Sequence, residues 1–281
     1  MKSETRFASF LVASRVRGSA RVWLRLAAAL LFARAAEAGI VTAVLTPAAD
    51  ATIFEENGDS SDAKGQGLFA GRDRIDNRRR AFLRFNLTGV PTGVAVSSVQ
   101  VRLSMTRSNS PSVFASLYRA SGAWGEGTSD AGIPGGSGAP ATPGDPTWTM
   151  RVYPATPWTS PGGDAAATPS ATTLLGTALV NYLWTTTPAL VSDVQGWINL
   201  PATNFGWQLR ADESQIAPTA KRFGSREQPD ASLRPLLIVT YDDPAVGPPE
   251  ATGVPALDAR AQAGLAALLA AGGVWLLRRT S

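Results

Sequence analysis

The sequence predicts an all-β protein, a jelly-roll β-sandwich of antiparallel strands with one short helix, a long loop excursion, and terminal signal and anchor segments. Three observations lead to this fold class. Apolar and polar residues alternate in many short stretches, as they do in half-buried strands. Gly- and Pro-rich turns separate those stretches, and helical spacing of apolar residues occurs in only one short segment.

Strands are expected throughout the central part of the chain. The alternation is cleanest over residues 99–106, where Val99, Val101 and Leu103 fall on one side of a strand and polar residues on the other. Residues 81–87 alternate in the same way, so one face is expected to join a core and the other to meet water. The expected strands are 40–45, 52–54, 81–87, 99–106, 112–118, 205–209, 221–225 and 235–241.

One short helix is expected over residues 190–199. Apolar residues that include Leu190 and Trp197 recur at helical spacing there, and Pro201 is expected to end the helix because proline cannot continue one. Trp197 and the later Trp207 lie in periodic apolar patterns, so both are expected in the core.

Residues 121–188 form a long excursion without any period. Gly, Pro, Thr, Ser and Ala dominate its composition. Aromatic residues are nevertheless frequent there, and disordered segments are poor in aromatics. We therefore expect an ordered excursion with one or two short strands, and we expect it to carry specificity, since loops hold binding groups.

The N-terminal residues 1–38 are typical of a secretory signal. Basic residues come first, an apolar run follows at residues 26–33, and Ala36-Glu37-Ala38 provides a small-x-small cleavage site. The apolar run is far too short to span a bilayer. We expect export, with cleavage after Ala38 and a sandwich domain over residues 39–242.

The C-terminal end mirrors the N-terminal one. A Pro/Gly-rich spacer covers residues 243–253, and residues 254–281 hold an apolar run that closes on Arg278 and Arg279. A helix of this run would span about 22 Å, which is marginal for a membrane. The arrangement resembles bacterial sorting signals of the PEP-CTERM and IPTL-CTERM type. It implies a sorting and processing machinery, transient membrane anchoring, and a cell-surface or extracellular location; a buried amphipathic helix is the alternative, although the run lacks a polar face.

Composition excludes several function classes. The chain has 281 residues and a formal net charge of +4, but residues 1–38 hold seven of its 26 basic and two of its 22 acidic residues, so the remainder carries −1. That balance removes the main electrostatic argument for nucleic-acid binding. Cysteine and histidine are absent, so no disulfide can form and the commonest general base and metal ligand are missing.

Arginines gather before the expected strand at 81–87. They are Arg72, Arg74, Arg78, Arg79 and Arg80. Guanidinium groups offer planar pairs of donors that match carboxylates, so one hypothesis is a site for an anionic ligand. The alternative is a solvated rim paired with Asp73 and Asp76.

The segments around these arginines resemble the DNRLRE domain family. The naming motif is matched by Asp-Asn-Arg-Arg-Arg-Ala at 76–81, with Arg79 in place of Leu and Ala81 in place of Glu. Supporting segments are FLRFNL at 82–87, VSSVQVRL at 96–103, WGEG at 124–127, PGGD at 161–164, DVQGW at 193–197, NFGW at 204–207 and RFGSRE at 222–227. The resemblance covers nearly all of 42–241.

This resemblance implies a jelly-roll sandwich in a secreted or surface protein. Some such domains are similar to modules that hold acidic polysaccharides such as alginate. A non-catalytic module with an alginate- or pectate-like partner is therefore expected. A structural component of the extracellular matrix, which packs against copies of itself, is the alternative.

A chain of uronic acids carries a carboxylate on each sugar, so its binding surface needs basic forks and flat aromatic faces. The expected charged contacts are Arg72, Arg74, Arg78, Arg79, Arg84, Lys221, Arg222 and Arg226. A strand from Lys221 lying beside the one from Ala81 would bring the two sets together, although a structural ion pair is slightly favoured for Arg84 and Arg226. The expected stacking residues are Trp124, Trp148 and Trp158.

A structural calcium site is an open hypothesis in the acidic loop at 55–67. Its hard oxygen ligands would be Glu55, Asn57, Asp59 and Asp62. The spacing resembles a calcium loop but lacks a terminal bidentate Glu, so an acidic turn without metal is the favoured alternative.

Catalysis has little support from the sequence. A glycosidase needs two opposed carboxylates, and the candidates Glu126, Asp164, Asp193 and Glu227 include no evident pair. A lyase using Tyr118, Tyr153 or Tyr182 is a further alternative. We expect the protein not to be an enzyme.

Overall fold

The computed structural model describes residues 39–56, 58–214 and 218–247. They belong to the first of two compact units, Met1–Gly247 and Pro248–Ser281. The predicted signal at 1–38 and the sorting segment at 254–281 lie outside the described residues. Within the described ranges, no helix is long and apolar enough to cross a membrane.

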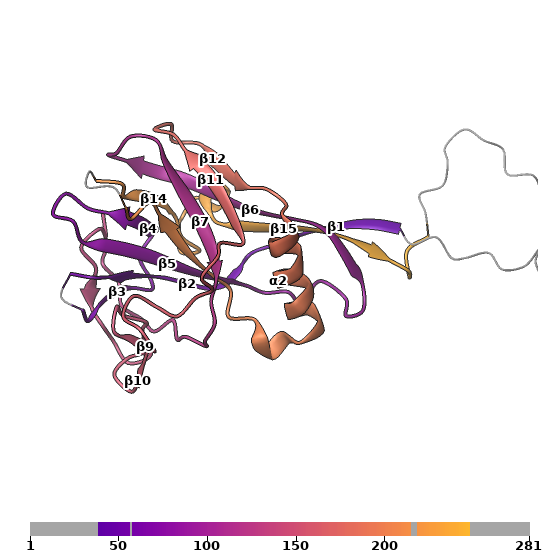
Figure 1. The fold of residues 1–281 in the computed structure, drawn as a ribbon, viewed down its shortest axis with the longest axis horizontal. Coiled ribbons are helices and arrows are strands. Elements are labelled where there is room, and N and C mark those ends of the chain that lie inside the picture. The colour runs from indigo at the N-terminus through magenta and orange to yellow at the C-terminus, as the bar shows by residue number, and fades with distance from the viewer. Residues whose placement is uncertain (1–38, 57, 215–217, 248–281) are drawn as a thin grey trace, which may run out of the picture. The chain divides into compact units, whose positions relative to one another are not determined.

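The described residues form an all-β fold with one α-helix (Figure 1). The strands are β1 (Gly39–Leu45), β2 (Pro47–Phe54), β3 (Ser60–Asp62), β4 (Gly67–Arg72), β5 (Arg78–Phe85), β6 (Ala95–Ser108), β7 (Val113–Arg119), β8 (Ala139–Pro140), β9 (Met150–Val152), β10 (Thr156–Pro157), β11 (Ala171–Leu175), β12 (Asn181–Trp184), β13 (Trp207–Ala211), β14 (Lys221–Gly224) and β15 (Leu236–Asp243). The helices are α2 (Pro188–Asn199) and the 3-10 turns η1 (Pro201–Thr203) and η2 (Ala231–Leu233).

Thirteen of the described strands pair antiparallel in a sheet that folds round on itself, and β9 and β10 form a separate two-stranded sheet. The order of the larger sheet is β1-β15-β6-β14-β4-β5-β13-β7-β11, and β12 pairs with β6. On the far side, β12 meets β11, where the Thr173 hydroxyl donates to the Leu183 carbonyl at 2.7 Å. The predicted sandwich of antiparallel strands is confirmed. The strand from Lys221 does not lie directly beside β5, however, because β4 separates them.

The main core fills the space between the two layers of the sandwich. The inner side of β5 contributes Ala81, Leu83 and Phe85, all buried, as its alternation predicts. Trp197 and Trp207 also lie in this core, with ring centroids 4.6 Å apart. Their predicted core positions are confirmed.

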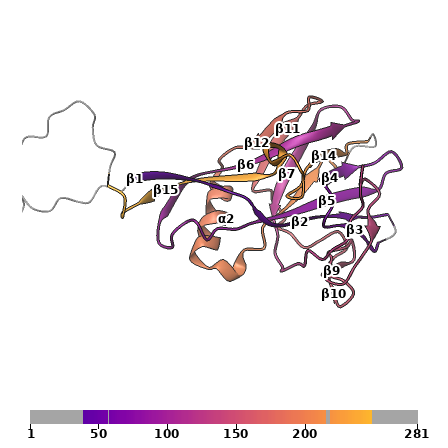
Figure 2. The same cartoon turned by 180° about the vertical axis from the view of Figure 1, so that it is seen from behind.

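The helix α2 begins two residues before the predicted start. Thr187 caps it, because its hydroxyl accepts a hydrogen bond from the Leu190 amide at 3.0 Å, and Pro188 occupies the first turn. Leu190 and Trp197 face inward, and the helix packs against β6 (Figure 2). The predicted end at Asn199 is confirmed.

The first part of the excursion, up to Gly163, folds back over the outer face of β2 and β5 and forms a second core there, whereas β11 and β12 join the main sheet. The excursion therefore holds five short strands, and the expectation of one or two is wrong. The second core contains Ala49, Ala51, Ile53, Ala63, Phe82, Ala120, Trp124, Trp148 and Trp158. Gly163 has φ 93°, and a Cβ at this position would lie 2.6 Å from the Phe82 ring, so the excursion approaches β5 where only glycine fits. The expectation that the outer face of β5 meets water is therefore wrong at Phe82, which is buried.

Candidate functional site

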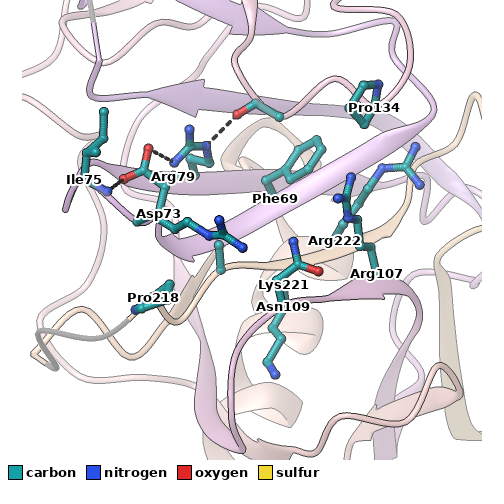
Figure 3. Close-up of a pocket in the computed structure, with 13 residues that line it drawn as sticks. Phe69, Asp73, Ile75, Arg79, Arg107, Asn109, Pro134, Pro218, Lys221 and Arg222 are labelled. Atoms are coloured by element: carbon teal, nitrogen blue, oxygen red, sulfur yellow. Dashed lines mark hydrogen bonds and ion pairs between the residues drawn. The ribbon is translucent and has the colours of Figure 1, made fainter.

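A cavity of about 330 Å³ opens beside β4, β14 and the end of β6 (Figure 3). Its lining residues are Phe69, Asp73, Arg74, Ile75, Arg79, Arg107, Asn109, Pro134, Gly136, Pro218, Ala220, Lys221 and Arg222. Four of them are arginines, so we call this cavity the arginine pocket. It joins Arg74 and Arg79, from one predicted set, to Arg222 from the other.

Strand register brings the central groups of the arginine pocket together. Arg222 of β14 pairs with Phe69 of β4 on one side and with Arg107 of β6 on the other. Cross-strand partners project to the same face of a sheet. The Arg222 guanidinium accordingly lies 5.8 Å from the centroid of the Phe69 ring, and both reach into the pocket.

The positive charges of this pocket are poorly compensated. Arg74, Arg107 and Arg222 form no ion pair with any other described residue. Burial lowers the pKa of Arg222, the nearby charge of Arg107 lowers it further, and Asp62 opposes the change. Its Nη1 donates to the Thr106 hydroxyl at 2.9 Å, while its buried Nε has no hydrogen-bond partner. Like charges on cross-strand partners are destabilising, so the bare pocket favours an anion.

Arg79 forms one wall of the arginine pocket but is already engaged. Its Nη1 lies 2.8 Å from Asp73, and its Nε donates to the Gly136 carbonyl at 2.7 Å. The side chain is buried and ties the excursion to β5. Arg79 therefore shapes the pocket rather than offering it a free guanidinium.

Lys221 is not available for ligand contact. Only 1% of the residue is exposed, and the side chain points away from the other pocket groups (Figure 3). Its Nζ donates to the Ser108 hydroxyl at 2.7 Å and to the carbonyls of Ser110, Pro111 and Gly176 at 3.0, 2.7 and 3.1 Å. Burial also lowers its pKa. The expectation of an exposed ammonium at this position is wrong.

Two further predicted arginines near β5 are neutralised by carboxylates. Arg72 lies 2.5 Å from Asp76 and donates to the Glu213 carbonyl at 2.6 Å. Arg78 holds Glu55 with two hydrogen bonds, one of them 2.8 Å long from Nε, and this contact lowers the pKa of Glu55. Neither side chain lines the arginine pocket.

Arg226 and Arg84 lie away from the arginine pocket. Arg226 holds Glu126 with two hydrogen bonds of 2.7 Å and also contacts Glu227 at 3.0 Å, which is the structural ion pair that the sequence favoured. Arg84 stacks over Trp124, with its guanidinium 5.5 Å from the ring centroid, and it has no ion pair with another described residue, so the ion pair favoured for it is wrong. The predicted arginines thus divide among several places, and one open face does not gather them all.

The three predicted stacking residues are buried, so exposed stacking on sugar rings is wrong for them. The Trp124 indole donates to the Phe205 carbonyl at 2.8 Å, and Trp158 stacks on Phe82 with ring centroids 5.2 Å apart. Trp148 lies within 5.0 Å of the guanidinium groups of both Arg78 and Arg80. All three rings anchor the excursion.

The predicted calcium ligands have separate roles. Glu55 holds Arg78, Asp59 accepts from the Thr149 hydroxyl at 3.3 Å, and Asp62 accepts from two backbone amides at 3.0 Å. Across the described ranges, no three acidic residues are grouped closely enough to hold a metal ion. Asn57 lies outside the described residues, so calcium at this loop stays a prediction.

Two of the four candidate catalytic carboxylates come together. Glu126 and Glu227 both contact Lys64, at 2.8 and 3.7 Å, and share Arg226. Buried Asp50 adjoins them, and burial followed by the Glu227 charge raises its pKa well above the ordinary value.

The other two carboxylates serve the fold. Asp164 accepts the amides of Thr159 and Ser160 in a turn. Asp193 accepts from the Ser170 hydroxyl at 2.6 Å and from the Trp207 indole at 2.8 Å. Their hydrogen bonds join neighbouring segments of the chain.

The candidate tyrosines of a lyase are dispersed. Tyr118 lies on β7, and the centroid of its ring is 4.6 Å from the Arg210 guanidinium. Tyr182 of β12 donates to the Ala178 carbonyl at 3.0 Å. Tyr153 precedes Pro154 in the β9–β10 turn. None of the three lines the arginine pocket.

Sequence reasoning missed Arg107 and Phe69. Arg107 directly follows the predicted strand 99–106 and is the penultimate residue of β6. Phe69 belongs to β4, which was not predicted. Alternation gave no signal for Arg107, because it follows Met105 on the apolar side of the predicted strand. A register shift, in which Arg222 pairs with Arg107 but Phe223 pairs with Met105, places it at the pocket.

Comparison with known protein families gives a match to part of the chain. No curated protein matches the chain. Residues 41–130, which include Phe69, Arg74, Arg79 and Arg107 of the arginine pocket, are similar to carbohydrate-binding module family 96, and this match indicates a carbohydrate-binding module.

Proposed function

We propose that the protein is an exported, non-catalytic module that binds acidic polysaccharide, alginate- or pectate-like, in the arginine pocket. One observation carries this proposal. Arg107 and Arg222 are direct cross-strand partners at an open cavity, and neither has an ion-pair partner among the described residues. The match to a carbohydrate-binding module family supports the ligand class.

The chemistry of the pocket suits a uronate. A carboxylate accepts two parallel hydrogen bonds from a guanidinium, and it would offset the repulsion between Arg107 and Arg222. Phe69, Ile75 and Pro134 supply apolar surface for the C–H groups of a sugar ring. The volume of about 330 Å³ lies at the small end for ligand pockets, which fits a short stretch of a chain.

Affinity gel electrophoresis of the full chain tests this function. Alginate or pectate in the gel should retard the protein, and added salt should weaken the retardation because exposed charge contacts are screened. Migration unaffected by either polymer would refute the proposal. The appearance of unsaturated uronate products, followed by ultraviolet absorbance, would instead indicate a lyase.

A self-associating structural component is the second candidate, and β1 favours it. This strand lies at one end of the sheet order, and Ile40 and Val44 on it are 73% and 58% exposed. An uncharged edge strand with apolar side chains can pair with another chain. Sedimentation that depends on protein concentration, without retardation by polysaccharide, would support this candidate.

Export and anchoring complete the proposal. We expect the mature chain to begin at Gly39, and we expect the sorting segment at 254–281 to hold it at the envelope until processing. Mass spectrometry of protein from the cell surface and the medium would test both termini. A mature chain that retains residues 1–38 would contradict export by this signal.

A further inference from the structure

A second hollow lies on a part of the sandwich that the excursion leaves uncovered. The excursion covers the outer face of the sheet only as far as β13, where the buried Gln208 side-chain amide donates to the Gly162 carbonyl at 2.7 Å. Beyond this line, Phe114 of β7 and Leu174 of β11 are direct cross-strand partners and are 59% and 54% exposed. The outer face of β7 and β11 is therefore open to solvent.

The hollow has a volume of about 330 Å³ and lies between β7 and the end of β13. Its walls come from Phe114, Ser116, Tyr118 and Arg210, and residues 212–214 close one side. It shares no lining residue with the arginine pocket. We call it the β7–β13 hollow.

Arg210 is the donor of this hollow. Its guanidinium stacks on Tyr118, 4.6 Å from the ring centroid, and its Nε donates to Gln208 at 2.5 Å. Burial, followed by the charge of Arg80, lowers its pKa to about 10, so the group stays protonated at neutral pH. Arg210 has no ion pair with another described residue, which leaves its outer nitrogens available to a ligand.

Carboxylates supply acceptors beside this donor. Both oxygens of Glu213 accept from Arg80, at 2.8 and 2.7 Å, and Oδ1 of Asp212 accepts from the amide and hydroxyl of Ser214. A carboxylate oxygen can accept more than one hydrogen bond. The hollow thus presents hydrogen-bond donors and acceptors together. A uronate is disfavoured there, because its carboxylate would lie near two carboxylates, Asp212 and Glu213, and only one guanidinium without an ion pair to another described residue, that of Arg210.

We propose that the β7–β13 hollow binds a neutral pyranose unit of a polysaccharide. The sugar hydroxyls, which both donate and accept, match Arg210 and the neighbouring carboxylates, while the apolar face of the ring packs on the exposed Phe114. This inference goes beyond the proposed function, because both the ligand class and the site differ. Two separate sites would let one module bridge acidic and neutral polysaccharides.

Titration calorimetry of the full chain with neutral hexasaccharides tests the proposal. The probes are cello-, xylo-, manno- and laminari-hexaose, and at least one should bind. Phe114→Ala should then weaken that binding roughly tenfold, since it removes an exposed aromatic platform. Arg210→Gln should weaken it by a similar factor. Val44→Ala removes an equally exposed apolar side chain on β1 and should leave it unchanged.

The outcomes separate this site from the arginine pocket. Phe114→Ala should not alter alginate retardation, and Arg107→Ser should not alter binding of the neutral sugar. Phe114 is largely exposed, so its variant should fold even if Arg210→Gln does not, and circular dichroism checks both. Absence of binding to all four hexasaccharides, or binding that survives Phe114→Ala in the folded protein, overturns the proposal.

Discussion

Arg107 of β6 and Arg222 of β14 are direct cross-strand partners, and burial, with a smaller effect from the positive charge of Arg107, lowers the pKa of Arg222. A sheet gains nothing from two like charges placed opposite each other. The pair is therefore better explained by binding than by stability. This distinction can be measured, because binding and unfolding should respond differently to the same substitution.

Arg107→Ser should weaken binding to alginate oligomers roughly tenfold, since it removes one charge-assisted contact. The same substitution should leave the free energy of unfolding unchanged or raise it by a few tenths of a kcal/mol, because it relieves cross-strand repulsion. Titration calorimetry and urea unfolding measure the two effects.

Arg102→Ser is the matched control for Arg107→Ser. Arg102 lies on the same strand, but its guanidinium donates to the carbonyls of Ser232 and Arg234, outside the pocket. Equal loss of alginate binding in the two variants would mean that overall charge, and not the arginine pocket, determines binding.

The buried tryptophans give a second prediction. Trp158→Ala should lower the free energy of unfolding by about 3 to 5 kcal/mol, because it empties the space above Phe82 in the second core. Trp158→Phe should cost less, since it keeps a ring there. Chemical unfolding followed by circular dichroism measures both. A Trp158→Ala protein of unchanged stability would contradict the anchoring role.

These tryptophans also show where sequence reasoning ends. Their Gly/Pro-rich surroundings suggested a solvent-exposed loop, but the excursion folds back and buries them on β5. Local composition does not encode which distant strand a loop will cover. By contrast, Trp197 and Trp207 were predicted correctly, because period and burial coincide within a helix or a strand.

The arginines show the same limit. Clustering of basic residues predicted an anionic site, and Arg74 and Arg222 do line one pocket. Sequence alone could not reveal that Glu126 lies 2.7 Å from Arg226, because the two are 100 residues apart. Nor could it reveal the burial of Lys221, which depends on carbonyls from three separate positions.

The fold was more predictable than the site. Long alternating stretches such as 99–106 identify strands directly, and the observed β6 spans Ala95–Ser108 around that stretch. Strands of two or three residues, such as β8 and β9, are too short to show a period. They exist because tertiary contacts hold them.

Asp62 should make stability depend on pH. Burial raises its pKa to about 6 from an ordinary value of 3.8, although two backbone amides oppose the shift. The folded state thus holds a proton that the unfolded state releases between these values, so the free energy of unfolding falls as pH rises from about 4 to 6. Two pKa units correspond to roughly 3 kcal/mol.

Asp62→Asn should remove this part of the pH dependence and stabilise the protein at pH 7. The pKa values of two other carboxyl groups, Asp50 and Glu227, are also raised, so these groups change the stability in the same direction. The informative quantity is therefore the difference in free energy of unfolding between the variant and the wild type. Urea unfolding from pH 4 to 7 measures it. A difference that stays constant with pH would refute the assignment to Asp62.

The edge strand β1 supplies the last prediction. If self-association occurs through β1, Val44→Lys should abolish it, because an exposed lysine on an edge strand opposes pairing with a second chain. The side chain is 58% exposed, so the substitution should change the free energy of unfolding by only about 0.5 kcal/mol. Sedimentation velocity over a range of concentrations gives the oligomeric state.

Leu183→Lys is the control, since Leu183 is 41% exposed but lies on β12, away from β1. Dimers that persist in Val44→Lys and vanish in Leu183→Lys would locate the interface on β12 and show that the free edge of β1 is not what joins the copies.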